Sequence, residues 1–261
     1  MDIALLLVLA ALPVIIILTV VYIRDRNKEP MSLLIKLFFA GFGSCILVLV
    51  ISGILELFLP FMKGSLANKS FIETLLYAFV GVALVEEFSK WFMTYTIGYH
   101  HREFDELYDG IVYAIFVSLG FAFIENILYV IQTASINTAL LRAISAVPSH
   151  ACDAIFMGYY LSMAKQYSLK GNKDAEQKNV FYSVLIPAIL HGIYDFCLMS
   201  GYMILVAVFL VFVIFLYILS LKKLKALSKN NKKIKFKNKF CQVCGKAVTG
   251  EFCSRCGTRQ V

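Results

Sequence analysis

The sequence predicts an all-α polytopic membrane protein with about seven transmembrane helices and a small zinc ribbon at its C-terminus. Of its 261 residues, 60% are hydrophobic and only 16% are charged, a composition outside the range of soluble domains. Apolar runs long enough to cross a ~30 Å hydrocarbon layer recur along the chain. Much of the net charge of +8 lies after residue 221, so nucleic-acid binding is not expected of the whole chain.

The apolar runs predict seven spans, each close to or above the ~20 residues that a helix needs to cross a membrane. They are 3–23, 33–60, 71–97, 108–133, 141–164, 180–200 and 201–221. The run from 180 to 221 is too long for one helix, so we expect a division at Ser200–Gly201; one kinked helix with an interfacial remainder is the alternative. The first run lacks the charged leader and cleavage site of a secretory signal, so we expect it to be retained.

The Lys and Arg residues of the connecting segments predict the orientation of the chain. With the N-terminus outside, the inner segments hold nine of them and the outer segments three, even without the basic C-terminal segment. We therefore expect a multi-pass protein of the cell membrane with its C-terminus in the cytoplasm.

The predicted domains are a membrane-embedded domain at 1–221, a basic linker at 222–239 and a cytoplasmic zinc ribbon at 240–261. The linker would bind anionic lipid of the inner leaflet at ~1 kcal/mol per basic residue, or serve only as a solvated stop-transfer segment.

The zinc ribbon is predicted from two Cys-x2-Cys pairs, each followed by glycine. Its ligands would be Cys241, Cys244, Cys253 and Cys256. Four thiolates suit tetrahedral Zn²⁺, and a site with no open position is structural rather than catalytic. Two disulfides are the competing interpretation, but they need an oxidising compartment, and the predicted orientation places this segment in the cytoplasm.

Charged residues inside the spans are the main functional signal, since each costs at least ~2.5–3.5 kcal/mol at the centre of a bilayer. The third span contains Glu86, Glu87 and Lys90 within the sequence VEEFSK. On a helix, Lys90 can reach both glutamates at spacings of three and four residues. These groups must therefore face a protein interior or a water-filled pocket.

Three later spans supply further polar groups. The fourth contains Glu125 and Asn126, and the fifth begins with His150. The sixth carries His191 and Asp195 four residues apart, a spacing at which a carboxylate can hold an imidazole.

Some of these residues also have a purely structural interpretation. Glu125 would then be a protonated carboxyl bonded within its bundle, and His150 an interfacial residue. Asp109, which precedes the fourth span, would cap that helix.

Together, these groups have the chemistry for general acid–base hydrolysis. One glutamate would activate a water, a His or Asn would donate to the oxyanion, and another His or Glu would protonate the leaving amine. The sequence contains no GxSxG, HExxH or paired GxGD-type motif, which argues against a serine or aspartyl intramembrane protease. A non-catalytic scaffold that docks through its ribbon is one alternative. A proton-coupled carrier is another, although no inverted repeat is visible.

Five segments between about residues 80 and 200 resemble, in order, the motifs of the PrsW family of intramembrane proteases. They are VEEFSK for the family's EExxK motif, FDELYDGIVYA for its DG block, GFAFIENI for its FxxxE-N block, PSHACDAIFMGYY and LHGIYDF. The matching residues are Glu86, Glu87, Lys90, Asp109, Glu125, Asn126, His150, His191 and Asp195.

The resemblance implies an intramembrane endopeptidase similar to type II CAAX prenyl proteases, with a glutamate-activated water and a His/Asn oxyanion site. The catalytic residues would be Glu86, Glu87, Glu125, His150 and His191. The supporting residues would be Lys90, Asp109, Asn126 and Asp195. The implied substrate is a membrane-anchored protein such as an anti-sigma factor, cut first near the outer face.

A catalytic zinc held by two histidines and a glutamate is an alternative to metal-free chemistry. We favour the metal-free form, because Lys90 lies within one turn of Glu86 and would weaken that carboxylate as a metal ligand. Apart from the structural zinc of the ribbon, no cofactor is then expected.

Overall fold

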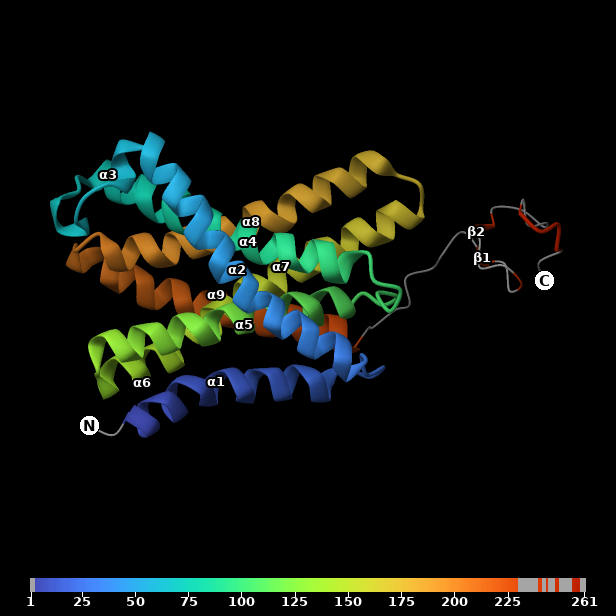
Figure 1. The fold of residues 1–261 in the computed structure, drawn as a ribbon, viewed down its shortest axis with the longest axis horizontal. Helices are drawn as coiled ribbons and strands as arrows, with labels where there is room; N and C mark the ends of the chain where they lie inside the picture. Colours follow the sequence, from blue (N-terminus) through green and yellow to red (C-terminus); the bar gives the residue numbers. More distant parts are fainter. Residues whose placement is uncertain (1–2, 230–238, 241–242, 244–246, 249–254, 259–261) are drawn as a thin grey trace.

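The computed structural model describes residues 3–229, 239–240, 243, 247–248 and 255–258. Helices make up most of this part of the chain, as the composition predicts, and they run side by side along one axis (Figure 1). The long helices are α1 (Ile3–Arg24), α2 (Met31–Phe58), α5 (Asp109–Thr133), α7 (Ala146–Leu169), α8 (Lys173–Met199) and α9 (Met203–Lys229). Two short strands, β1 (Lys239–Phe240) and β2 (Ala247–Val248), pair antiparallel near the C-terminus.

The third predicted span is one helical run that changes its winding three times. After the short turns η1 (Pro60–Met62) and η2 (Leu66–Asn68), a capping box between Ser70 and Glu73 starts α3. The run consists of α3 (Phe71–Leu76), η3 (Tyr77–Leu84), α4 (Val85–Met93) and η4 (Thr94–Tyr99). Both η3 and η4 are π-helical, a wider winding that is frequent at functional sites. They flank α4, which carries the charged motif.

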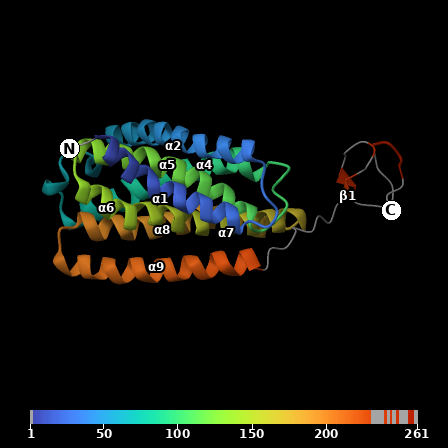
Figure 2. The ribbon, with the colours of Figure 1, turned by 90° about the horizontal axis from the view of Figure 1, so that it is seen from below.

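Five helices of the described chain are long and apolar enough to cross a membrane by length and composition: α1, α2, α5, α8 and α9. The other two predicted spans correspond to the α3–η4 run and to α7. Buried polar residues lower the apolar content of both: Glu86, Glu87 and Lys90 in the α3–η4 run, and His150 and Asp153 in α7. Figure 2 shows α9 along one edge of the bundle, next to α7 and α8.

The predicted division of the run 180–221 into two helices is confirmed. Helix α8 ends at Met199 and α9 begins at Met203, with Gly201 at φ 73° in the turn between them. A positive φ of this kind favours glycine, which has no Cβ. Helix α9 continues to Lys229, so residues 222–229 of the predicted linker are helical.

The predicted start of the fifth span was wrong. Residues 141–144 belong to a separate short helix, α6 (Ile136–Ile144), and α7 begins only at Ala146. The chain bends at Ser145, which is both the C-cap of α6 and the N-cap of α7. The apolar residues of α6 continue the hydrophobic run of α7 in the sequence, so composition alone does not show the break.

Helix α5 is the centre of the bundle, with every residue from Asp109 to Ala122 buried. It packs against α1, α2 and α7. Helices α2 and α5 approach so closely that a Cβ on Gly120 would lie 2.0 Å from the Phe38 carbonyl oxygen. Small residues at such crossings allow two helix backbones to meet.

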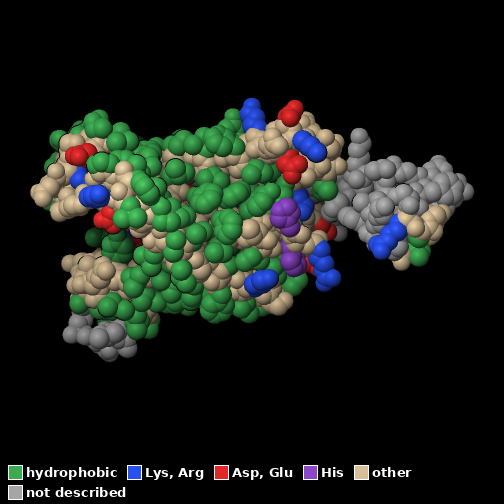
Figure 3. Space-filling view, turned by 45° about the horizontal axis from the view of Figure 1, so that its top comes forward, with side chains coloured by type: hydrophobic (Ala, Val, Ile, Leu, Met, Phe, Trp, Pro, Cys, Tyr) green, Lys and Arg blue, Asp and Glu red, His purple; other side chains and the backbone are tan. Residues whose placement is uncertain are grey.

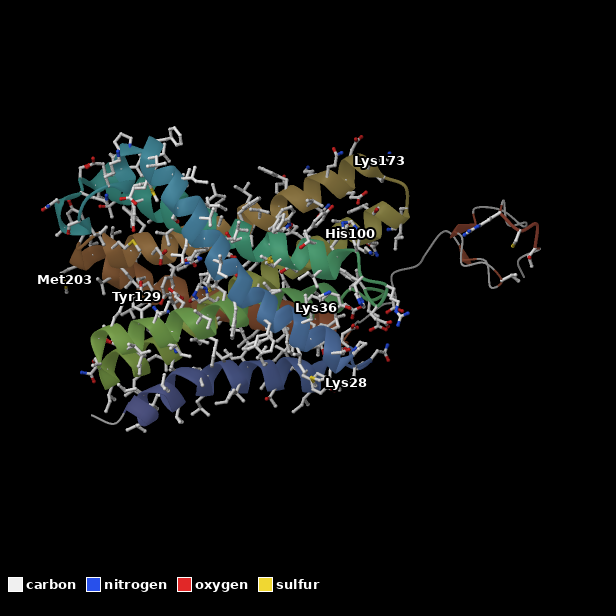
Figure 4. The ribbon with its side chains drawn as sticks, in the orientation of Figure 1. Lys28, Lys36, His100, Tyr129, Lys173 and Met203 are labelled. Atoms are coloured by element: carbon white, nitrogen blue, oxygen red, sulfur yellow. The ribbon has the colours of Figure 1, made fainter. Side chains whose placement is uncertain are left out.

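The outer surface of the bundle is apolar between two polar ends. Figure 3 shows hydrophobic side chains over the middle of the visible face and most charged side chains near the ends. One end carries Lys28, His100 and Lys173, and the other carries Met203 (Figure 4). They are called here the Lys173 end and the Met203 end. An apolar band between polar ends is the surface expected of a protein that spans a bilayer.

Candidate active site

The charged motif of α4 points into the bundle. Glu86, Glu87 and Lys90 are buried, with 8%, 0% and 0% of their surface exposed. The Lys90 ammonium lies 2.6 Å from Glu87 Oε1 and 3.5 Å from Glu86 Oε2, as the helical spacing predicts. Buried charges in proteins are paired, and here one lysine pairs with two glutamates of its own helix.

Helix α8 brings His191 against both glutamates. Its Nδ1 lies 2.8 Å from Glu87 Oε1, and its Nε2 lies 3.9 Å from Glu86 Oε2. Asp195, one turn further along the helix, places Oδ2 3.4 Å from the same Nε2. The predicted contact between His191 and Asp195 is therefore present, and the hydrogen bond to Glu87 holds the imidazole ring beside α4.

Helix α7 brings His150 to the other side of Lys90. His150 Nδ1 lies 3.3 Å from the Lys90 ammonium, and Nε2 lies 2.9 Å from Glu125 Oε2 on α5. An ammonium can only donate hydrogen bonds, so Nδ1 accepts and the ring proton is on Nε2, where it is donated to Glu125. The two imidazole rings, of His150 and His191, lie 5.3 Å apart.

Glu125 has a second partner that the sequence does not reveal. Arg142 Nη2 lies 2.9 Å from Glu125 Oε2, and its Nε donates to Asn126 Oδ1 at 2.8 Å. Arg142 comes from the short helix α6, and the sequence shows it only as one of a few basic residues on the outer side. The charge pair forms because α6 folds back against α1 and α5.

Asp153 also belongs to the cluster, although sequence reasoning left it out of the predicted site. It is 1% exposed, and no described residue forms a hydrogen bond with its Oδ1. Single ligand atoms of Glu87, His150, Asp153 and His191 all lie within 4.8 Å of one another. Two imidazoles and two carboxylates are a donor set that suits Zn²⁺. The i, i+3 spacing from His150 was the signal that could have identified Asp153.

Two predicted supporting residues lie away from Glu86. Asn126 donates to the Ala10 carbonyl at 2.9 Å, which ties α5 to α1. Asp109 accepts the backbone N–H groups of Asp105 and Glu106 at 3.0 and 2.7 Å. It begins α5, about 24 Å along the helix axis from Glu125 at 1.5 Å per residue.

The predicted ribbon ligands Cys241, Cys244 and Cys253 lie outside the described residues, and only Cys256 is described. The zinc ribbon therefore remains a prediction.

The arrangement can activate a water. Glu86 Oε2 has no hydrogen-bond partner among the described residues, and the Glu86 side chain is 11% exposed. Glu87 is fully enclosed and bound to Lys90 and His191. Glu86 is therefore the less enclosed of the two carboxylates and the candidate for binding a water, and Glu87 organises the groups around it.

Comparisons with known proteins show the family of the chain. The model of the PrsW family, described as intramembrane metalloproteases, matches residues 29–220. A "Protease PrsW" of Oceanobacillus iheyensis is 42% identical over 203 residues, covering 76% of this chain and 86% of its own. One from Clostridioides difficile is 33% identical over 237 residues, covering 89% and 95%. One from Bacillus subtilis is 36% identical over 189 residues, covering 72% and 80%. No solved structure matches the chain.

The family match covers most of the chain and includes all of the helices that form the cluster. Its description as a metalloprotease family fits a site whose residues include a metal-type donor set. The chain therefore belongs to the PrsW family of intramembrane proteases and is a multi-pass membrane peptidase, a hydrolase acting on peptide bonds.

Proposed function

We propose that Glu86 activates a water which hydrolyses a peptide bond of a membrane-anchored protein. The observation that carries this proposal is the meeting of two glutamates and two histidines from α4, α7 and α8 around one buried lysine. Ionisable side chains are costly to bury within a membrane, so a cluster of them marks a functional site.

The proposed reaction begins with a water held between Glu86 Oε2 and His191 Nε2, which lie 3.9 Å apart. Glu86 takes one proton as the water oxygen attacks the carbonyl carbon. The Lys90 ammonium, 3.5 Å from Glu86 Oε2, stabilises the negative charge that develops on the carbonyl oxygen. When the C–N bond breaks, Glu86 returns the proton to the leaving amine.

The remaining residues position these groups. Glu87 holds Lys90 and His191 at 2.6 and 2.8 Å. Glu125, itself paired with Arg142, holds the ring of His150. These contacts keep Lys90 and both imidazoles oriented when no substrate is bound, and such preorganisation is what makes electrostatic stabilisation effective.

The first test is hydrolysis by the purified full-length protein in detergent. Glu86→Gln keeps the shape of the side chain but removes the base, so the rate should fall by ~10²–10⁴-fold without loss of abundance. Glu56→Gln is the matched control, because Glu56 is an exposed glutamate on α2. A Glu86→Gln enzyme that cuts a single-span substrate at the control rate contradicts the proposal.

A metal-assisted form of the reaction is the second candidate, and the donor set favours it. Glu87, His150, Asp153 and His191 would hold the ion, and Glu87 Oε2 and Asp153 Oδ1 have no hydrogen-bond partner within the described part of the chain. A bound Zn²⁺ would polarise the substrate carbonyl and make a hydroxide available near neutral pH. We favour the metal-free form, because Lys90 already neutralises Glu87 at 2.6 Å and a cation bound to these ligands would compete with it.

Metal analysis separates the two forms if the ribbon is disabled first. A variant with Ser at the four predicted ribbon positions removes the second source of zinc; the substitutions are Cys241→Ser, Cys244→Ser, Cys253→Ser and Cys256→Ser. The metal-free form predicts that this variant contains no stoichiometric zinc and stays active after chelation. One zinc per chain, with activity lost on chelation and restored by Zn²⁺, supports the metal-assisted form.

The proposed topology has the N-terminus outside, the Met203 end at the outer face and the Lys173 end in the cytoplasm. The basic residues support it, since Lys28 and Lys173 share one end of the bundle (Figure 4) and the positive-inside rule puts such loops in the cytoplasm. Labelling of single cysteines at Ser65 and at Gly171 by an impermeant reagent in intact cells tests the orientation. If only the cysteine at position 171 is labelled, the orientation is the reverse of the proposed one.

The proposed substrate is a single-span protein such as an anti-sigma factor, as the motif resemblance implies. Proteomics of new protein termini in cells with the wild-type chain and with Glu86→Gln identifies it. A terminus that needs Glu86 and lies near the outer end of a transmembrane segment supports this substrate class. Glu86-dependent termini found only in proteins without a membrane anchor contradict it.

The C-terminal segment has a separate proposed role. Its four cysteines would bind one structural Zn²⁺ and form a docking module, and its lysines would bind anionic lipid. Removal of residues 230–261 should abolish ribbon zinc and weaken binding to anionic vesicles, while hydrolysis by the membrane domain continues.

A further inference from the structure

A second buried group of acids lies toward the Lys173 end, about 24 Å along α5 from Glu125 at 1.5 Å per residue. It consists of Asp25 after α1, Glu106 in the segment before α5, and Asp109 at the start of α5. One carboxylate oxygen from each lies within 4.8 Å of the other two. All three residues are nearly inaccessible, with exposed fractions of 2%, 3% and 0%.

Three oxygens of these carboxylates lack hydrogen-bond partners among the described residues. Neither oxygen of Asp25 accepts a hydrogen bond, and neither does Asp109 Oδ1. No described Lys or Arg forms an ion pair with Asp25 or Asp109. Buried charges are normally paired or bound to metal, and Asp25 is a buried carboxylate without an ion-pair partner among the described residues that is directed into the cluster.

The nearest basic side chain is used elsewhere. The Lys28 ammonium donates to the backbone carbonyls of Tyr22, Ile23 and Asp25 at the end of α1. Glu106 accepts a hydrogen bond from the Asn27 amide, and Asp109 Oδ2 accepts two backbone N–H groups. These contacts fix the carboxylates in place but leave the oxygens of Asp25, and one oxygen of Asp109, free to take a cation.

We propose that Asp25, Glu106 and Asp109 bind a hard divalent cation, Ca²⁺ or Mg²⁺. All three ligands are carboxylates, which suit these ions, whereas zinc sites usually include imidazole or thiolate. Calcium–oxygen bonds of ~2.3–2.6 Å place two ligands of one ion at most ~5 Å apart, and magnesium–oxygen bonds of ~2.0–2.1 Å at most ~4 Å. The observed separations fit Ca²⁺ directly, and Mg²⁺ after a small contraction.

The ion would join the connection between α1 and α2 to the start of the central helix α5. These segments are far apart in sequence, and Tyr113 on α5 adds a hydrogen bond to Glu29 at 2.6 Å. A cation that binds only the folded protein stabilises it as its concentration rises above the dissociation constant. The site would therefore fasten α1 and α2 to the core, independently of the peptidase reaction.

The experiment is thermal unfolding of the full-length protein in detergent, first in EDTA and then with rising CaCl₂ or MgCl₂. The wild-type protein should gain several degrees in a saturable manner, up to ~10 mM cation, above the ~10⁻³ M dissociation constants of weak calcium modules. Asp25→Asn and Glu106→Gln should lose most of this gain. Asp174→Asn, at an exposed acid in the first turn of α8, should keep it.

Equilibrium dialysis with ⁴⁵Ca²⁺ adds a direct measurement, which also serves if one variant does not fold. One cation per wild-type chain that is lost in either folded variant supports the site. The proposal is overturned if neither ion stabilises the wild-type protein. It is also overturned if the folded Asp25 or Glu106 variant responds as strongly as Asp174→Asn.

Discussion

Substitution of Gly120 by alanine should disturb both the packing of the bundle and the active site. A methyl group at this position would lie 2.0 Å from the Phe38 carbonyl oxygen and 2.9 Å from its carbonyl carbon. Carbon and oxygen atoms in contact are separated by ~3.3–3.6 Å, so α2 and α5 must move apart by ~1.3 Å. The obstacle is backbone, and no side-chain rotation can relieve it.

The energetic consequence follows from this displacement. Overpacking of a buried contact costs ~1–3 kcal/mol, and a backbone obstacle favours the upper end of that range. Alanine recovers ~1 kcal/mol through its higher helix propensity, which leaves a net loss of ~2 kcal/mol. Helix α2 also packs against α4, so the shift changes the position of Glu86 relative to Glu125. A ~1 Å misplacement of reacting groups can cost ~10²-fold in rate.

The assays are thermal unfolding and peptide hydrolysis by the same detergent-purified variants. Gly53→Ala is the control, because a Cβ at Gly53 in α2 meets no atom within 4 Å and should gain only helix propensity. We expect Gly120→Ala to unfold several degrees lower and to cut ~10–100-fold more slowly, while Gly53→Ala does neither. Equal stability and rate in both variants would refute the inferred contact between the two backbones.

Three further predictions concern ionisable groups. Arg142→Gln leaves Glu125 without its cation. Breaking a fully buried pair costs ~3–5 kcal/mol; because the Arg142 and Glu125 side chains are 15% and 21% exposed, we expect the unfolding free energy to fall by less than that. Adding Glu125→Gln should restore stability but not the rate of hydrolysis. Lys90→Met should reduce abundance by leaving Glu87 buried and uncompensated, at ~3–5 kcal/mol, and a stable, active Lys90→Met protein would contradict the charge assignment. Burial raises the pKa of Glu29 from 4.5 to about 7, although the Tyr113 hydroxyl bond opposes the shift. The folded state therefore holds this proton more tightly than the unfolded chain, and the unfolding free energy should fall as pH rises from about 4.5 to about 7. Unfolding free energy measured against pH in EDTA checks this, and the Glu29→Gln variant should lack this part of the decrease.

The predicted architecture succeeded because membrane spans are encoded by long apolar runs, and the division at Gly201 followed from length alone. The start of the fifth span was wrong because α6 and α7 are both apolar at the junction, and only the bend at Ser145 separates them. The C-terminal ribbon stays a prediction, since three of its four cysteines lie outside the described residues.

Contacts within one helix were determined by the sequence alone. The pairing of Lys90 with Glu86 and Glu87, and of His191 with Asp195, follows from the three- and four-residue spacing that places side chains on one helical face. The identity of the groups that must avoid lipid was equally clear, because an ionisable side chain in an apolar span is too costly to leave in contact with hydrocarbon.

Contacts between helices were decided only by the tertiary structure. The pairing of Arg142 with Glu125, the entry of Asp153 into the cluster and the meeting of Asp25 with Asp109 each join different helices or the segments between them. Spacing along the chain carries no information about contacts between different helices. These contacts depend on the distance and rotation of one helix against another, which are set at close crossings such as that of Gly120.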